Sequence, residues 1–393
     1  MNPVISISVY MITQLLVLEA VGRGIYSFME AGWIRRTACL IVFLVYLSLA
    51  LLPVAGALLP DSSLKFRLQA AGNIWLGYDV YLLLGLLVFL PGIRLFHLIR
   101  RHPKEPVIGF AVAAAAVFSL VILFYGMAHA QTTKVTRLSL STEKPLGETH
   151  HLKLVLIGDL HMSVNSKPEM IRRIVEMINE EDADAVLIAG DFLTSSYEAL
   201  ASPEEYEEAL RGIRSRDGVF AVYGNHDVEE TLFGGFPISP VEQAFRSEEI
   251  EQFIRDCGVT ALCDEQTEIA GGAVQIVGRL DGEKAGDGTS DRKTAAEVLA
   301  DTDPEKEIIV LQHEPVGFEA LRESGADLVL CGHTHNGQIF PGNLIVPFFN
   351  ENAYGLKTIG GRDTVVTSGT GNYGPPKRVG TDSEIMVLEI SET

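Results

Sequence analysis

The stretch Leu154-Val155-Leu156-Ile157-Gly158-Asp159-Leu160-His161 decides how the rest of the chain is interpreted. Its four leading apolar residues are typical of a buried strand in a parallel sheet. Gly158 allows a sharp turn at the carboxyl end of that strand, which is where ligands bind in open α/β sheets. We therefore expect Asp159 and His161 to project from a rigid strand into a crevice. One Asp-x-His pair is weak evidence, because many surface turns contain one.

The same arrangement recurs at four further predicted strands, 185–189, 219–223, 308–312 and 327–330. Each is followed by polar residues of metal-binding type. These are Asp191; then Asn225, His226 and Asp227; then His313; then His333 and His335. A turn residue or a satisfied core histidine explains any one of them, but not five strands together. Carboxylate oxygen, amide oxygen and imidazole nitrogen suit iron, manganese or zinc.

Helical patterns alternate with these strands. Apolar residues recur with helical spacing in 168–181, and 203–215 has a proline where the first turn of a helix accepts one. Further helices are predicted at 247–257 and 291–300. Further short strands are predicted at 260–262 and 274–277, and in the tail at 344–346, 356–359, 364–368 and 384–389. This alternation predicts an α/β domain with helices packed on the faces of extended sheets.

The motifs resemble those of the calcineurin-like metallophosphoesterase superfamily. The matching blocks are Gly158-Asp159-Leu160-His161, Gly190-Asp191, Gly224-Asn225-His226-Asp227, His313 and Gly332-His333-Thr334-His335. All five occur in family order, over roughly residues 151–393. The resemblance implies a two-sheet β-sandwich flanked by helices, with two metal ions at one edge.

The resemblance also implies a role for each residue. One metal would be held by Asp159, His161 and His335, and the other by Asn225, His313 and His333. Asp191 would bridge both ions. His226 would be the catalytic acid, and Asp227 would orient its ring.

The residue types fit these roles physically. Because Asn225 and the histidines are neutral ligands, two divalent ions would leave the site positive enough to attract a phosphate. Distant acidic surface charges are screened over about 8–10 Å. Two ions about 3.5–4 Å apart can activate water for an in-line displacement at phosphorus. His226 can donate a proton to the leaving oxygen near neutral pH.

A further candidate is Arg378, which ends the segment 372–378 after a glycine-rich turn. The segment resembles the family's C-terminal loop near the site, so Arg378 could contact a phosphate. A solvated basic residue explains it equally well.

The first third of the chain is predicted to lie in a membrane. Four apolar stretches, 4–21, 38–59, 74–98 and 107–127, approach or exceed the roughly 20 residues that a membrane-crossing helix needs. Glu19 and Asp79 interrupt two of them. Both could mark an intramembrane function, but we expect them to lie near helix ends and reach interfacial water.

Loop charges suggest the orientation of these spans. Basic residues are more numerous in the loops after the first and third spans than in the second loop or after the fourth span. The first group is Arg23, Arg35, Arg36, Arg94, Arg100, Arg101 and Lys104, and the second is Lys65, Arg67, Lys134 and Arg137. The excess predicts that the first group faces the cytoplasm, so the catalytic domain is expected to be extracytoplasmic.

The charge changes abruptly near residue 130. Residues 1–130 have a net charge of +4 and residues 131–393 of −24. So acidic a region is a poor nucleic-acid binder. We expect three parts: a transmembrane region of about four helices (1–130), a linker that is either a tether or a lead-in edge strand (131–150), and a metallophosphoesterase domain (151–393).

These features predict a membrane-anchored metal-dependent phosphoesterase. Its substrate class would be a phosphodiester or pyrophosphate, with a lipid-linked ester as one form, and its cofactors two metal ions (Mn, Fe or Zn). An alternative is a catalytically silent metal-binding scaffold or sensor on a membrane bundle, but such a loss should remove a ligand or His226, and none is missing.

Overall fold

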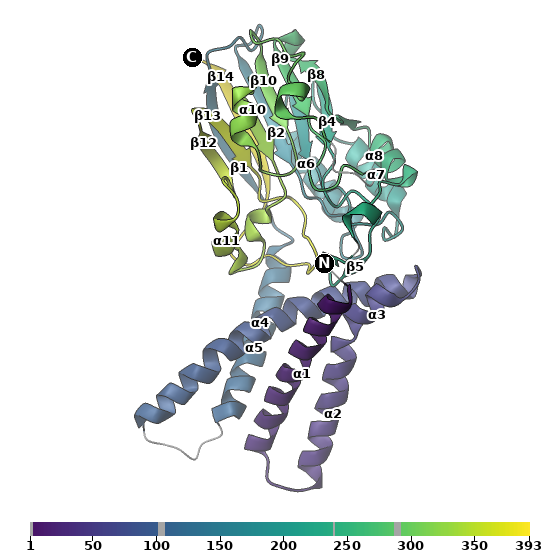
Figure 1. Ribbon diagram of the computed structural model, residues 1–393, viewed down its shortest axis with the longest axis vertical. Helices are drawn as coiled ribbons and strands as arrows, with labels where there is room; N and C mark the ends of the chain where they lie inside the picture. The colour runs from purple at the N-terminus through teal and green to yellow at the C-terminus, as the bar shows by residue number, and fades with distance from the viewer. Residues whose placement is uncertain (1–2, 101–106, 239, 287–291) are drawn as a thin grey trace. The chain divides into compact units, whose positions relative to one another are not determined.

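The computed structural model describes residues 3–100, 107–238, 240–286 and 292–393. The chain divides into two compact units (Figure 1). One comprises residues Met1–Ala128 with two short later segments, Thr231–Ser239 and Gly374–Lys377. The other comprises His129–Glu230, Pro240–Tyr373 and Arg378–Thr393. We call them the helical unit and the sheet unit.

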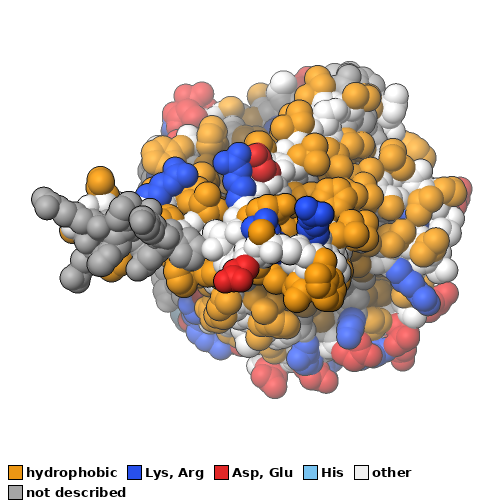
Figure 2. Space-filling model, turned by 90° about the horizontal axis from the view of Figure 1, so that it is seen from below, with side chains coloured by type: hydrophobic (Ala, Val, Ile, Leu, Met, Phe, Trp, Pro, Cys, Tyr) orange, Lys and Arg blue, Asp and Glu red, His pale blue; other side chains and the backbone are white. Residues whose placement is uncertain are grey.

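The helical unit is built from long apolar helices. They are α1 (Pro3–Phe28), α2 (Trp33–Ala50), α3 (Leu52–Leu58), α4 (Ser63–Arg100) and α5 (Val107–His129). Within the described residues, four stretches are long and apolar enough to cross a membrane: Val4–Phe28, Trp33–Leu58, Ser63–Phe96 and Val107–His129. These are the four spans that the sequence predicts. On the face drawn in Figure 2, hydrophobic side chains predominate and charged ones are scattered among them.

Two charged residues used in the orientation argument, Arg101 and Lys104, lie outside the described residues. So does Asp291, the first residue of a predicted helix.

Asp79 corrects one expectation about these helices. It lies in the interior of α4, not near an end, and is 3% exposed. Gln14 Nε2 donates to its carboxylate at 2.6 Å, and the Tyr46 hydroxyl at 3.2 Å. Neighbouring helices thus supply the hydrogen bonds that interfacial water was expected to supply. Glu19 is exposed and pairs with Arg23.

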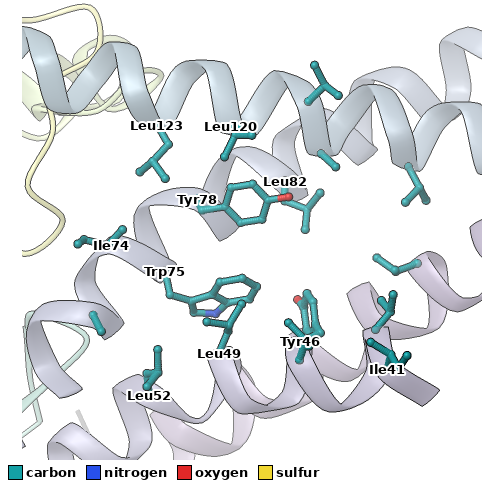
Figure 3. A pocket seen from close by; sticks show the side chains of 17 residues that line it. Ile41, Tyr46, Leu49, Leu52, Ile74, Trp75, Tyr78, Leu82, Leu120 and Leu123 are labelled. Carbon is teal, nitrogen blue, oxygen red and sulfur yellow. The ribbon is translucent and has the colours of Figure 1, made fainter. Parts of the chain in front are cut away.

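An apolar cavity lies beside this polar cluster (Figure 3). Its volume is about 780 Å³. The rings of Tyr46, Trp75 and Tyr78 face it, together with aliphatic side chains such as Leu49 and Leu120. Helices α2, α4 and α5 therefore leave an apolar pocket between them.

The sheet unit contains two six-stranded sheets. The first has the order β1-β14-β2-β3-β4-β7. Its strands are β1 (Thr133–Thr142), β14 (Ser383–Glu392), β2 (His151–Ile157), β3 (Ala185–Ala189), β4 (Gly218–Val222) and β7 (Thr260–Ala261). The strands β2, β3, β4 and β7 are mutually parallel, because helical crossovers join β2 to β3 and β3 to β4.

The second sheet has the order β12-β13-β11-β10-β9-β8. Its strands are β12 (Gly355–Ile359), β13 (Arg362–Val366), β11 (Leu328–Cys331), β10 (Glu307–Leu311), β9 (Val274–Gly278) and β8 (Glu265–Ile269). Strands β9, β10, β11 and β13 are parallel. A small hairpin, β5 (Leu232–Phe233) and β6 (Phe236–Pro237), belongs to the helical unit.

Alternating strand residues build separate layers. Leu154 and Leu156 of β2 face the second sheet, in a core that also holds Ile309 of β10. Val155 and Ile157 face the opposite side, where helices cover the first sheet. Those helices are α6 (Pro168–Glu180), α7 (Pro203–Arg211) and α8 (Glu248–Asp256). The short helices α9 (Ala295–Val298) and α10 (Phe318–Glu323) cover the second sheet (Figure 1). The result is the predicted two-sheet sandwich flanked by helices.

Some local predictions differ from the structure. Residues 344–346 were predicted as a strand, but they belong to the helical turns α11 (Gly342–Ile345) and η4 (Val346–Phe348). A three-residue apolar run does not distinguish a strand from a helical turn. For residues 131–150 the sequence left two interpretations open, a tether or a lead-in edge strand. Residues 133–142 form the edge strand β1, which pairs in parallel with β14.

Candidate metal centre

Every predicted ligand lies just beyond the carboxyl end of a parallel strand. Asp159 and His161 follow β2, Asp191 follows β3, and Asn225 follows β4. His313 follows β10, and His333 and His335 follow β11. The two sheets therefore each bring their strand ends to one place, although the ligands span 159 to 335 in the sequence.

One group of side chains consists of Asp159, His161 and His335, whose ligand atoms all lie within 4.8 Å of one another. The Nε2 atoms of the two histidines are 2.9 Å apart. His335 Nε2 lies 3.5 Å from an oxygen of Asp159. All three residues are buried.

A second group forms around His313. Its Nε2 lies 3.0 Å from Oδ1 of Asn225 and 3.2 Å from Nδ1 of His333. Asp159, Asp191 and His313 also have ligand atoms within 4.8 Å of one another.

Asp191 joins the two groups. Its Oδ2 lies 3.4 Å from Nε2 of His161 and 3.2 Å from Nε2 of His313. A single carboxylate oxygen thus touches a histidine of each group, as a bridging ligand does.

The electrostatics of the pocket fit a cation. Burial raises the pKa of Asp159 to about 7 and lowers the pKa of His161 and of His333 to about 3. Burial alone would also lower the pKa of His313, but the carboxylates of Asp191 and Asp159 hold it well above its ordinary value. Carboxylates buried this deeply need positive charge beside them. Neutral imidazoles are the form that ligates metals.

Outer contacts orient the ligands. Nδ1 of His313 lies 2.7 Å from the carbonyl oxygen of Ala189, which leaves Nε2 toward the pocket. Nδ1 of His161 lies 3.0 Å from Oγ1 of Thr194. The Asn225 amide donates to Glu283 at 2.9 Å, so its oxygen faces His313. Such contacts fix ring and amide orientation in metal sites.

The backbone at the strand ends is strained. Asp159, His161, Asp191, His333 and His335 all have φ between 45° and 74°, the left-handed region that residues other than glycine rarely adopt. Backbone strain of this kind persists where surrounding structure enforces it, and it clusters at functional sites.

His226 lies beside the metal ligands, but its ring is not oriented by Asp227. The Asp227 carboxylate accepts the backbone N–H groups of Asp191, Leu193 and Gly224. Its role is to tie the β3 and β4 turns together. The expected contact with the His226 ring is therefore not supported by the geometry.

Glu230 occupies the position expected for Asp227. Its Oε1 lies 3.2 Å from Nδ1 of His226 and accepts a hydrogen bond from Ser195 Oγ at 2.6 Å. Its Oε2 accepts from Lys284 Nζ at 2.7 Å. The side chains of Glu230 and Lys284 are 1% and 3% exposed.

Arg378 also differs from its expected role. It is fully buried, and its guanidinium donates to the carbonyls of Ser368, Gly369, Gly371 and Asp382. It organises the loop between β13 and β14, so a contact with phosphate is not supported. Tyr373, in the same loop, does approach the site: its ring centroid is 4.6 Å from that of His226.

The sequence analysis does not identify Glu230, Lys284 or Glu283. It does predict that segment 372–378 lies near the site, and Tyr373 of that segment is the residue whose ring approaches His226. Glu230 follows His226 by four residues, and that spacing was the one available signal. Lys284 and Glu283 come from the loop after β9, where no pattern marks them.

Comparison with known proteins agrees with this geometry. Residues 152–337 match the family model described as calcineurin-like phosphoesterase. The chain is 32% identical over 243 residues to an uncharacterized metallophosphoesterase of Helicobacter pylori, covering 61% of this chain and 60% of the relative. It is 31% identical over 293 residues to a transmembrane protein with metallophosphoesterase domain of Danio rerio, covering 71% of this chain and 62% of that one.

A third relative is the phosphodiesterase YaeI of Escherichia coli, 26% identical over 61% of this chain and 82% of the relative. The chain spans only about three fifths of the length of the first two relatives. The match over residues 152–337, the strand-end side chains and the two-sheet sandwich make this part of the chain similar to calcineurin-like phosphoesterases. In the sequence it follows four described helices that are long and apolar enough to cross a membrane.

Proposed function

We propose that the protein is a membrane-anchored phosphoesterase that hydrolyses a phosphodiester or pyrophosphate with two bound metal ions. The observation that carries this proposal is the position of Asp191, whose Oδ2 contacts His161 and His313 together. When bound, the ions supply Lewis-acid activation of water and of the phosphoryl oxygens.

The side chains divide the remaining work. Asp159, His161 and His335 hold one ion, Asn225, His313 and His333 the other, and Asp191 both. His226 donates a proton to the leaving oxygen, and Glu230 orients its ring through Nδ1. The nitrogen that faces the substrate is then Nε2.

The first test is metal analysis of the purified full-length protein followed by a panel of phosphoesters that includes lipid head groups. We expect two ions of Mn, Fe or Zn per chain and turnover of at least one diester or pyrophosphate. A fully metallated protein that hydrolyses none of them would favour the alternative, a metal-binding scaffold or sensor.

The variant His226→Ala tests the catalytic acid. We expect it to keep both ions and to lose most turnover of esters with poor leaving groups, by about 10²–10⁴-fold. Esters with good leaving groups need less protonation and should lose less. Normal activity toward poor leaving groups would remove His226 from the mechanism.

A lipid-linked substrate follows from the membrane anchor, because the anchor keeps the domain near head groups. Equal turnover of soluble and lipid-linked esters would count against it.

We keep the three parts proposed from the sequence, 1–130, 131–150 and 151–393. The distribution of basic residues among the loops favours an extracytoplasmic position for the last part. Protease added to intact cells should then cut the acidic domain, and full protection would reverse the orientation.

A further inference from the structure

An uncharged segment follows the last metal-ligating histidine. No charged residue occurs between His335 and Glu351, although residues 131–393 have a net charge of −24. The segment contains α11 and η4 and belongs to the sheet unit.

Five large apolar side chains of this segment are exposed, and we call them the apolar patch. They are Phe340 (45%), Leu344 (57%), Ile345 (49%), Phe348 (85%) and Phe349 (82%). Among the described residues, Phe348 and Phe349 are the most exposed large hydrophobic side chains, exceeding even those of the apolar helices. The last four recur at helical spacing, which places them on one side of the α11 and η4 turns.

The segment is anchored from its other side. The Phe340 N–H donates to the Val379 carbonyl at 2.8 Å, and Ile339 forms a bridge with Val379. Asn350 Nδ2 donates to the Val346 carbonyl at 3.1 Å and closes the turn. The polar groups of the segment thus form hydrogen bonds within the domain, whereas its phenyl rings are exposed. An exposed apolar patch of this kind marks a membrane or protein contact.

Two observations favour a lipid bilayer over a protein partner. The last candidate span ends at His129 and β1 begins at Thr133, so only three residues join strand β1 of the sheet unit to a helix that is apolar enough to cross the membrane. In addition, the segment has no charged side chain, so its insertion into a bilayer would bury no charge although the rest of the domain is acidic.

We propose that the apolar patch inserts into the head-group region of the bilayer that the N-terminal helices cross. The patch then acts as a second contact with the membrane, independent of the helices. Because it begins five residues after His335, it would hold the metal centre near lipid head groups. This last consequence rests on the proposed function, whereas the insertion itself does not.

The test places a nitroxide spin label on full-length protein reconstituted into phosphatidylethanolamine–phosphatidylglycerol liposomes. Phe348→Cys and Phe349→Cys are labelled separately, in a background where Cys39 and Cys263, the cysteines that are not buried, are replaced by Ser. Val316→Cys is the matched control, since Val316 is also an exposed apolar residue of the sheet unit. Collisions are measured with oxygen, which enters lipid, and with a water-soluble nickel chelate.

Labels at 348 and 349 should collide often with oxygen and rarely with the nickel chelate. The label at 316 should collide often with the nickel chelate. Nickel collisions at 348 and 349 equal to those at 316 would overturn the proposal. So would spin–spin broadening that disappears on dilution with unlabelled protein, because a second copy would then cover the patch. Phosphoesterase activity enters neither outcome, so failure of the proposed function would be seen separately.

Discussion

At the scale of single residues, the His226 ring is contacted by Glu230 and not by Asp227, its neighbour in the sequence. Asp227 is adjacent in sequence, yet it holds backbone N–H groups. Glu230 faces the ring, and Lys284 neutralises Glu230. A carboxylate that contacts Nδ1 fixes the orientation of an imidazole ring.

The variant Glu230→Gln keeps the shape of the side chain but removes its charge. We expect both metal ions to remain and turnover of poor leaving groups to fall by about 10-fold or more, because the His226 ring loses its orienting charge. An aryl phosphodiester series with leaving groups of different pKa measures this as a steeper dependence on leaving group.

Glu229→Gln is the control, because this neighbouring carboxylate accepts from the backbone N–H of Tyr197 and the hydroxyl of Ser247, away from His226. The double variant His226→Ala, Glu230→Gln should be no slower than His226→Ala alone. Additive losses would mean that Glu230 acts elsewhere.

At the scale of elements, glycines at the strand ends leave room for the ligands. Gly190 has φ of 82°, and a Cβ there would lie 2.8 Å from Nδ1 of His313. A Cβ on Gly224 would overlap Oδ1 of Asp191. The turns after β3 and β4 therefore pack so closely that even one methyl group displaces a ligand.

Gly224→Ala should lower the metal content while the two sheets remain folded. The added methyl group displaces the carboxylate of Asp191, which joins both groups of ligands. Metal analysis and circular dichroism on the same preparation measure the two effects. Two tightly bound ions in a folded variant would show that Asp191 can shift without cost.

At the scale of the whole molecule, we expect metal binding to be linked to folding of the sheet unit. The ligands come from five strands of two sheets, so they are close together only in the folded chain. An ion that binds only the folded state stabilises it by about 2.7 kcal/mol at a free concentration 100 times its Kd.

Removal of metal with a chelator should therefore lower the unfolding temperature of the wild type. Asp191→Ala, which is expected to be metal-free already, should not respond. Both tryptophans, Trp33 and Trp75, lie in the N-terminal helices, so calorimetry is a better measurement than tryptophan fluorescence. A wild type that does not respond, with its metal verifiably removed, would contradict the linkage.

Much of the fold could be predicted because its signals are local. An apolar run ending in glycine and aspartate predicts a strand and its turn at Leu154–Asp159, and continuous hydropathy predicts the four spans. Residues 344–346 form helical turns instead of the predicted strand, because three apolar residues are too few to distinguish the two periods. Asp79 was misplaced because its partners, Gln14 and Tyr46, lie on other helices.

The sequence by itself determined the candidate ligands, because every one of them follows a predicted strand and the residue types alone indicate metal chemistry. Tertiary structure alone decided which side chains meet: Glu230 beside His226, Glu283 beside Asn225, and Arg378 buried among carbonyls. The physical reason is that some of these contacts join loops that are distant in the sequence, and the others depend on the direction in which a side chain points. Such contacts are set by how the two sheets pack, and no local pattern records that packing.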